Sequence, residues 1–487
     1  MTRTAPDGAV VAVFDVGKTN VKLNAVSTDG TVLEALSTPN DVHPGPPFRH
    51  HDLPRLEAWL LAGLAELAGR HRLGWVVTSG HGSGGVLVDD TGPVLPMIDY
   101  EQPLPEDFQD EYRAAAGPFF DRGSAVMMAA THQARQLMWF EREFPDEVAR
   151  ARWLLGVPQY WAFRLSGVAA AEYSLLGAQS HLWNVPEHCN AAIVAARGWE
   201  RLMPPIAPAW ASLGPVRADL AARWNLPPDL SILCGVHDSS ANFYRYKAAG
   251  LDGLTLLSTG TWIVGLRRTD DLSLVSEVRG MTLNADLAGR PVAGALTMGG
   301  REFALVAGDG AALKRADPAL VAALVARGTF AVPSFGSEDG LFPGSGGRGR
   351  IEGPPPETPE ERRALATLYT ALLADVCLSA LQAEGQVVLD GSFVRDPLFA
   401  SLVAALRPGK PMLYSLDADG VAAGAALLAT HTARTAPVEI PLETPAPLDL
   451  PALAAYRARW LALAEAGDRS PAGGHAAGAP HSNTKNA

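Results

Sequence analysis

A short turn near the N-terminus carries residue types that suit a phosphate group. Asp15, Gly17, Thr19 and Asn20 stand close together there, directly after a run of apolar residues. Gly17 lets the backbone come near an anion, and successive backbone N–H groups in such a turn can form an anion-binding concavity. Asp15 is expected to hold Mg²⁺ through water, because Mg²⁺ keeps several waters and takes only one or two carboxylates. The alternative is an ordinary β-hairpin with Asp and Gly in its turn.

Two strands must position this turn. Residues 10–16 are mostly β-branched or apolar, which is typical of a strand covered on both faces. Residues 21–26 then alternate between apolar and polar. Residues 253–266 repeat the pattern of strand, small polar turn and strand, with Ser258-Thr259-Gly260-Thr261 at the turn. The repeat suggests two related domains that close on one phosphate chain.

Polar side chains also follow other predicted strands. His81-Gly82 comes after a strand at 75–79, and Asp99-Tyr100-Glu101 lies shortly beyond it. Because open α/β sheets bind ligands at the carboxyl ends of their strands, these residues are candidate hydrogen-bonding groups for a polyhydroxylated ligand. Ordinary surface-loop chemistry is the alternative interpretation.

Asp238 is the candidate base. A buried strand at 230–236 leads into His237-Asp238, and a helix is predicted from Ser239. A carboxylate at such a strand end can accept a proton from a sugar hydroxyl if it lies within hydrogen-bond reach. The alternative is that Asp238 only caps the helix.

Length and composition narrow the function classes. The 487 residues predict two or three domains. A net charge of −12 argues against a nucleic-acid partner, although it does not argue against a nucleotide. Cys189, Cys234 and Cys377 are too few and too far apart for a disulfide framework, so we expect a cytoplasmic protein. Residues 1–8 lack the order of a signal peptide, and no apolar stretch of about 18 residues predicts a membrane span.

The C-terminal half offers a second group of motifs. A long helix at 360–384 precedes a strand at 386–389 that ends in Asp390-Gly391-Ser392, and residues 420–429 form a small-residue helix. The segment from about Asp468 is rich in Gly, Ala, Ser, Asn and Pro without an apolar period. We expect that tail to be disordered.

The order of these motifs resembles the FGGY family of carbohydrate kinases, over about residues 10–435. The resemblance implies an α/β fold in which two actin-like (ribonuclease-H-like) domains flank an ATP cleft. Residues 9–245 would form the N-terminal domain, which binds sugar and phosphate, and residues 246–440 the C-terminal domain, which binds the nucleotide. Residues 441–487 would be a C-terminal helix and the disordered tail.

The resemblance also implies a role for each motif. Asp238, within Gly235-x-x-Asp238-x-x-Ala241, would be the catalytic base, and Asp15 would position Mg²⁺. Adenosine would lie near Gly391 and Ser392, with Gly424-Ala425-Ala426 in the same region. The ATP phosphates would be held by Gly17, Lys18, Thr19, Asn20, Lys22, Thr259, Gly260 and Thr261.

The sugar-binding motifs are most similar to the branch of L-rhamnulose and L-fuculose kinases. We therefore expect transfer of the γ-phosphoryl group of Mg-ATP to O1 of a 6-deoxy-ketohexose, with sugar and ATP as small-molecule partners and a homodimer as one candidate assembly. The sugar would contact His81, Gly82, Asp99, Tyr100, Glu101, His237 and Asn284. A xylulose, ribulose or sugar-alcohol kinase, or a catalytically silent sensor of sugar or nucleotide, are the alternatives.

The chain departs from the family pattern at three places. Lys18 stands where many members have Thr or Ser, and Asp99-Tyr100-Glu101 replaces a familiar Trp-x-Asp-x-Arg segment. Asp390 begins the adenosine loop where the family has Gly. The second departure bears on the identity of the sugar rather than on the type of reaction.

Overall fold

The computed structural model describes residues 8–466. The tail predicted to be disordered from Asp468, and nearly all of the segment 1–8, lie outside the described residues. The N-terminal half contains β1 (Val10–Val16), β2 (Asn20–Ser27), β3 (Val32–Pro39), β4 (Val42–His43), β5 (His50–His51), α1 (Leu53–Ala68), β6 (Leu73–Gly80), β7 (Gly85–Val88), α2 (Glu106–Ala115), α3 (Phe119–Arg122), α4 (Gln133–Glu143), α5 (Pro145–Arg150), β8 (Trp153–Gly156), α6 (Val157–Ser166), α7 (Tyr173–Leu176), β9 (Trp183–Asn184), β10 (Cys189–Asn190), α8 (Ala192–Ala196), β11 (Ser212–Pro215), α9 (Ala218–Trp224), β12 (Ser231–Leu233), β13 (Val236–His237) and α10 (Asp238–Ala248). The C-terminal half contains β14 (Thr255–Thr259), β15 (Ile263–Arg268), β16 (Met281–Ala285), β17 (Pro291–Thr297), α11 (Gly299–Ala307), α12 (Pro318–Arg327), β18 (Phe330–Val332), β19 (Arg350–Glu352), α13 (Pro359–Ala380), β20 (Val387–Gly391), α14 (Pro397–Leu406), β21 (Met412–Tyr414), α15 (Gly420–Ala426) and α16 (Leu453–Ala466).

The N-terminal sheet has the strand order β11-β12-β6-β1-β2-β3, with β13 also paired to β6. Strand β1 pairs antiparallel with β2 through the predicted turn and parallel with β6 on its other side. The apolar side chains of β1 are at most 6% exposed. This burial on both faces explains why the strand shows no polar alternation.

The C-terminal sheet repeats that arrangement. Its order is β16-β17-β15-β14-β20-β21, and β14 pairs antiparallel with β15 and parallel with β20. Each sheet therefore carries one tight hairpin whose first strand has a parallel neighbour. The repeat of strand, turn and strand predicted from the sequence is confirmed.

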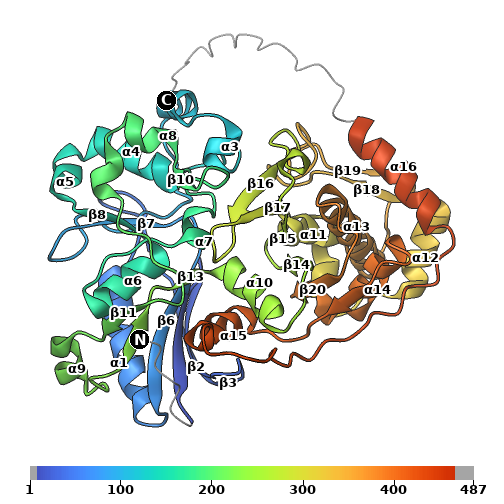
Figure 1. Ribbon diagram of the computed structural model, residues 1–487. Helices are drawn as coiled ribbons and strands as arrows, with labels where there is room; N and C mark the ends of the chain where they lie inside the picture. The colour runs from blue at the N-terminus through green and yellow to red at the C-terminus, as the bar shows by residue number, and fades with distance from the viewer. Residues whose placement is uncertain (1–7, 467–487) are drawn as a thin grey trace, which may run out of the picture.

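The two sheets lie on opposite sides of helices α10 and α15, which cross between them (Figure 1). A Cβ at Gly424 would overlap the carbonyl oxygen of Ala241, so only glycine lets the two helices approach this closely. The predicted division at 245/246 falls in the last turn of α10, and it stays a prediction as a domain boundary. We refer to α10 and α15 as the hinge helices.

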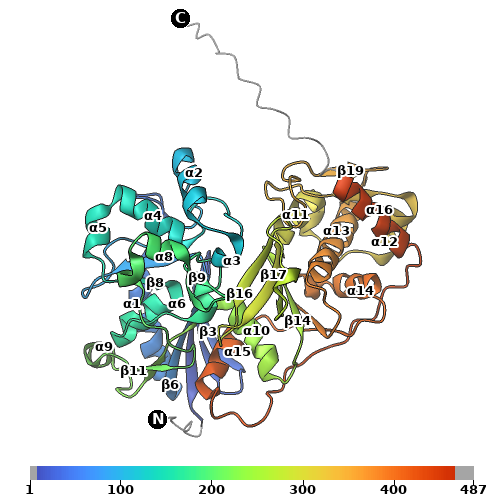
Figure 2. The same cartoon turned by 45° about the horizontal axis from the view of Figure 1, so that its top comes forward.

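A smaller group of helices, including α2, α4, α5 and α8, lies on the outer end of the N-terminal half (Figure 2). Its core contains large aromatic residues such as Phe108, Tyr112 and Phe140. Strands β7 and β8 pair with each other and form a two-stranded sheet separate from the main sheet. Leu87 on β7 and Leu154 on β8 belong to the core of this outer group.

Helix α13 forms the centre of the C-terminal core. Among residues 8–466 it is the one helix long and apolar enough to cross a membrane by length and composition. In the structure 89% of its most apolar 18-residue window is buried inside the molecule. Such burial is typical of a core helix, and the length of the helix alone is weak evidence for a span.

Candidate active site

The first predicted phosphate turn is tight and braced from outside. The N–H of Gly17 donates to the carbonyl of Asn20 at 3.1 Å, and the side chains of Thr19 and Asn20 are exposed. Asn40 holds the turn from the end of β3: its side-chain amide donates to the Gly17 carbonyl at 2.7 Å, and its N–H donates to that of Thr19 at 2.9 Å. The role of Asn40 was not predicted from the sequence, since nothing local marks a residue twenty positions away as the support of a turn.

Asp15 and Asp238 lie near each other at the carboxyl ends of central strands of the N-terminal sheet. Val16 and His237, which neighbour them, both pair with Gly80 of the central strand β6. The pKa of Asp15 is raised to about 7, chiefly by burial and also by the nearby charge of Asp238, while Lys22 acts in the opposite direction. The predicted metal-binding carboxylate and the predicted base therefore lie within electrostatic range of each other.

Asp238 occupies the first position of helix α10, and the N-cap position belongs to His237. The N–H and the hydroxyl of Ser239 both donate to the Asp238 carboxylate. His237 Nε2 lies 3.2 Å from the same carboxylate. With 28% of its side chain exposed, Asp238 is fixed in orientation and still accessible, and both properties suit a base.

His81 presents a buried ring without hydrogen-bond partners. Neither Nδ1 nor Nε2 has a partner among residues 8–466. Burial lowers the pKa of His81 to about 4, so the ring is neutral and offers one donor and one acceptor. Its edge contacts Tyr100, with 5.5 Å between ring centroids. Because buried polar groups are nearly always satisfied, the two free nitrogens suit a ligand with hydroxyl groups.

The loop after His81 is held in place by helix α4. A Cβ at Gly82 would lie 2.5 Å from the carbonyl oxygen of Ala178, so no larger residue fits there. Gln133 donates to the Gly82 carbonyl at 2.9 Å, and Gln136 donates to that of Ser83 at 2.6 Å. The roles of these two glutamines were not predicted from the sequence, because a helical Gln gives no local sign of what it binds.

Asp99 is fully buried and bound on both oxygens by cations. Lys18 donates to Oδ1, and Arg49 donates to Oδ2 from Nε at 3.2 Å and Nη2 at 2.8 Å. Burial raises the pKa of Asp99, but the hydrogen bonds from Lys18 and Arg49 outweigh it and the pKa is lowered overall. The carboxylate is therefore occupied by protein groups, and it orients Lys18 and Arg49. Arg49 was not predicted from the sequence.

Lys18 lies against the predicted sugar segment in this structure. Its ammonium is 3.4 Å from Glu101 and 4.7 Å from the centroid of the Tyr100 ring. The structure thus brings Lys18, Asp99, Tyr100 and Glu101 together. The contact of Lys18 with ATP phosphates stays a prediction.

The second predicted phosphate turn is joined to the adenosine loop. The Thr259 hydroxyl donates to the Asp390 carbonyl at 2.6 Å and accepts from the N–H of Phe393 at 3.2 Å. That hydroxyl is therefore engaged within the protein. The Thr261 carbonyl accepts from the N–H of Gly300 at 3.0 Å, so the first turn of α11 packs against the same turn.

Gly391 and Asp390 have distinct structural roles. Gly391 has φ of 94°, and a Cβ there would overlap the Thr259 carbonyl. The Asp390 carboxylate accepts from Asn242 at 2.9 Å and from the Tyr246 hydroxyl at 2.8 Å. Asn242 and Tyr246 belong to α10, so the unusual Asp at the start of the adenosine loop ties the C-terminal sheet to a hinge helix.

Lys22 and Asn284 lie apart from the predicted sugar-binding residues around His81 and Asp99. Lys22 Nζ lies 3.2 Å from Asp419 Oδ1, at the start of α15, and so links the two halves of the chain. Asn284 lies on β16, where it donates to Thr282 at 2.9 Å, and it lines a cavity together with His237. None of His81, Gly82, Asp99, Tyr100 and Glu101 lines that cavity.

Two family models match the chain. Residues 10–243 match the description "FGGY family of carbohydrate kinases, N-terminal domain". Residues 252–437 match "Carbohydrate kinase FGGY, C-terminal domain".

Curated relatives and solved structures agree with these matches. The L-fuculokinase of Escherichia coli (strain K12) is 27% identical over 296 residues, which are 57% of this chain and 61% of the relative. The chain thus spans less than two thirds of the length of that relative. A carbohydrate kinase from Novosphingobium aromaticivorans is 32% identical with a TM-score of 0.83, and the match covers 94% of this chain and 99% of the other. A xylulose kinase from Lactobacillus acidophilus, at 14% identity and a TM-score of 0.79 over 94% and 97% of the two chains, shares the fold. The predicted α/β fold with two domains is confirmed.

Proposed function

The chain belongs to the FGGY family of carbohydrate kinases, and from that premise we propose that it transfers the γ-phosphoryl group of Mg-ATP to O1 of a ketose, L-rhamnulose or L-fuculose. The observation that carries the proposal is the proximity of Asp15 and Asp238 beside the first predicted phosphate turn. A base and a metal-binding carboxylate at neighbouring strand ends suit phosphoryl transfer to a hydroxyl.

In the proposed reaction Asp238 accepts the proton of the attacking hydroxyl. The sugar oxygen forms a bond to the γ-phosphorus, the bond from that phosphorus to the β–γ bridging oxygen breaks, and ADP leaves. The turn at Gly17–Asn20 and the turn at Gly260–Thr261 hold the phosphates from two sheets, while Gly391 and Ser392 lie near the adenosine. Phosphoryl transfer depends mainly on positioning and charge stabilisation, which two rigid hairpins can supply.

Asp15 would hold Mg²⁺ in this scheme. Within residues 8–466 no group of three or more His, Cys, Asp or Glu side chains could hold a metal ion by itself. A single buried carboxylate suits Mg²⁺, which is commonly bound through one or two carboxylates, waters and the phosphates of the nucleotide. The bound cation would neutralise charge that develops on the transferred phosphoryl group.

The sugar identity rests on the residues around His81. The neutral ring of His81 offers two free nitrogens, and His237 stands next to the base. The relatives named L-fuculokinase support a 6-deoxy-ketohexose. All three cysteines are free, and two are buried, in keeping with the proposed cytoplasmic location. A silent sensor would not need Asp238 or the two phosphate turns, and all three are present.

A coupled assay of ADP release tests the proposal. Purified protein and Mg-ATP are offered a panel of ketoses, aldoses and polyols. Turnover with L-rhamnulose or L-fuculose at least about tenfold above that with the other sugars, in kcat/KM, is the expected result. A preference for xylulose, ribulose or a polyol would support the kinase activity and refute the proposed sugar substrate. ATP binding without turnover of any sugar would favour the alternative of a catalytically silent sensor.

A further inference from the structure

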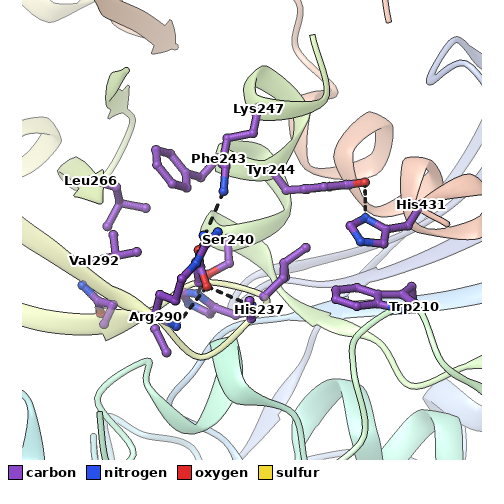
Figure 3. A pocket seen from close by; sticks show the side chains of 15 residues that line it. Trp210, His237, Ser240, Phe243, Tyr244, Lys247, Leu266, Arg290, Val292 and His431 are labelled. Carbon is purple, nitrogen blue, oxygen red and sulfur yellow. Dashed lines mark hydrogen bonds and ion pairs between the residues drawn. The ribbon is translucent and has the colours of Figure 1, made fainter. Parts of the chain in front are cut away.

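A cavity of about 260 Å³ lies beside hinge helix α10 (Figure 3). One wall is a single face of that helix, from which Ser240, Phe243, Tyr244 and Lys247 project at helical spacing. The hairpin of β16 and β17 forms the opposite wall, and Trp210 and His431 close one end. We call this space the hinge cavity. Both halves of the chain contribute to it.

The hinge cavity is largely aromatic and aliphatic. Trp210 and His431 stack with 3.9 Å between ring centroids, and the Tyr244 hydroxyl is bonded to His431 Nδ1 at 2.7 Å. Phe243 and Leu266 line the side away from this stack. A cavity of about 150 Å³ lined by Leu, Ile and Phe is known to hold benzene. The space here is sufficient for one aromatic ring with a short substituent.

The charged groups of the cavity leave one cation weakly paired. Asp286 accepts from Arg290 at 3.0 Å for Nε and 2.9 Å for Nη2, and also from the backbone N–H of Arg290. Lys247 Nζ lies farther away, 3.7 Å from the same carboxylate. Lys247 and Arg290 against Asp286 leave one net positive charge, because burial lowers the pKa of both His237 and His431 and keeps them neutral. An anionic ligand group beside Lys247 would balance this charge.

The cavity is separate from the proposed phosphate turns, and it reaches the histidine that precedes the proposed base. None of Gly17, Lys18, Thr19, Asn20, Thr259, Gly260 and Thr261 lines it. His237 does line it, with Nδ1 bonded to Ser240 Oγ at 3.1 Å and Nε2 3.2 Å from the Asp238 carboxylate. A ligand in the cavity would therefore contact the residue that orients Asp238.

We propose that the hinge cavity is a regulatory site for a small aromatic carboxylate. The ring would lie against Phe243 and the stacked pair of Trp210 and His431, and the carboxylate would pair with Lys247. Because the walls come from both sides of the hinge, the ligand would favour one arrangement of the two halves over another. A ligand shifts such an equilibrium by its difference in affinity for the two arrangements.

Two pairs of probes that differ in charge but hardly in shape test the proposal. Phenylacetate and phenylacetamide form one pair, and indole-3-acetate and indole-3-acetamide the other. Calorimetric titration of the full chain, without sugar or ATP, measures binding directly. At least one acid is expected to bind at least about tenfold more tightly than its amide, since a charged hydrogen bond is lost in the amide. This readout is independent of the proposed kinase activity.

Substitutions locate the binding. Lys247→Met should weaken binding of the acid by about tenfold, and Val292→Phe should abolish it by filling the cavity. Lys410→Met is the matched control, because Lys410 pairs with Glu384 on the surface of the C-terminal half and lines no part of the hinge cavity. The proposal is overturned if neither acid binds at millimolar concentration, if the amides bind equally well, or if Lys247→Met and Val292→Phe leave binding unchanged.

Discussion

The ammonium of Lys18 donates to the carboxylate of Asp99, 81 residues further along the chain. This hydrogen bond joins the first phosphate turn to the segment expected to bind sugar. It also gives Lys18 a partner that it would have to leave in order to reach a phosphate. In the proposed reaction the pair would connect occupancy by ATP with occupancy by sugar.

Lys18→Met and Asp99→Asn should change the apparent KM for Mg-ATP in opposite directions. Loss of the cation should raise that KM by about tenfold, because a charged hydrogen bond to phosphate disappears. Loss of the Asp99 charge leaves Lys18 with the longer 3.4 Å contact to Glu101, so Lys18 is held less strongly and the KM for Mg-ATP should fall. Steady-state kinetics at saturating sugar give both values. If both variants retain the wild-type KM for Mg-ATP, Lys18 does not contact phosphate.

Asp238→Asn should lower kcat by roughly 10² to 10⁴ and leave ATP binding nearly intact. The amide can still accept the hydrogen bonds that Ser239 donates, so the effect should be on proton transfer and not on folding. Asp219→Asn is the control, since Asp219 also lies in the first turn of a helix but on the surface. Near-wild-type turnover of Asp238→Asn would remove Asp238 from the mechanism.

Gly391→Ala should lower the thermal unfolding midpoint more than Gly409→Ala. Both glycines have positive φ, 94° and 75°, so an alanine at either site carries strain of roughly 1–2 kcal/mol. At Gly409 a Cβ meets open space, whereas at Gly391 it would overlap the Thr259 carbonyl. Scanning calorimetry compares the two variants. Equal losses would mean that the adenosine loop adjusts without cost.

The stability of Glu172→Gln relative to wild type should increase as the pH rises from 5 to 8. Burial raises the pKa of Glu172 from 4.5 to about 7, against the hydrogen bonds that it accepts from Ser174 and Leu175. The folded protein therefore keeps a proton that the unfolded chain releases between about pH 4.5 and 7. Unfolding free energy falls as the pH rises through that window, on the order of 3 kcal/mol in total.

Gln does not titrate, so the variant does not show this decrease in unfolding free energy. Thermal midpoints of wild type and Glu172→Gln at several pH values check the effect, and Glu465→Gln, at an exposed position on α16, serves as the control. Curves for Glu172→Gln and wild type that run parallel across this range would show that Glu172 is ionised in the folded protein throughout.

Local sequence determined the two hairpins, the long helix α13 and the buried stretch that leads into Asp238, which forms two short strands, β12 and β13, where one was predicted at 230–236. These features depend on neighbours in the chain: a doubly buried strand must be apolar, and a tight turn selects small residues. For that reason the turn at Gly17–Asn20 and the repeat at Ser258–Thr261 could be predicted without any knowledge of the fold.

Only the tertiary structure decided which side chains meet. Arg49, Asn40 and Gln133 reach the site from distant segments, and their partners are set by sheet order and helix packing. Likewise the carboxylate of Asp390 binds α10, and Asn284 lines the hinge cavity apart from His81. Contacts between residues far apart in the chain have no periodic or local signature, because they arise when separate elements pack together.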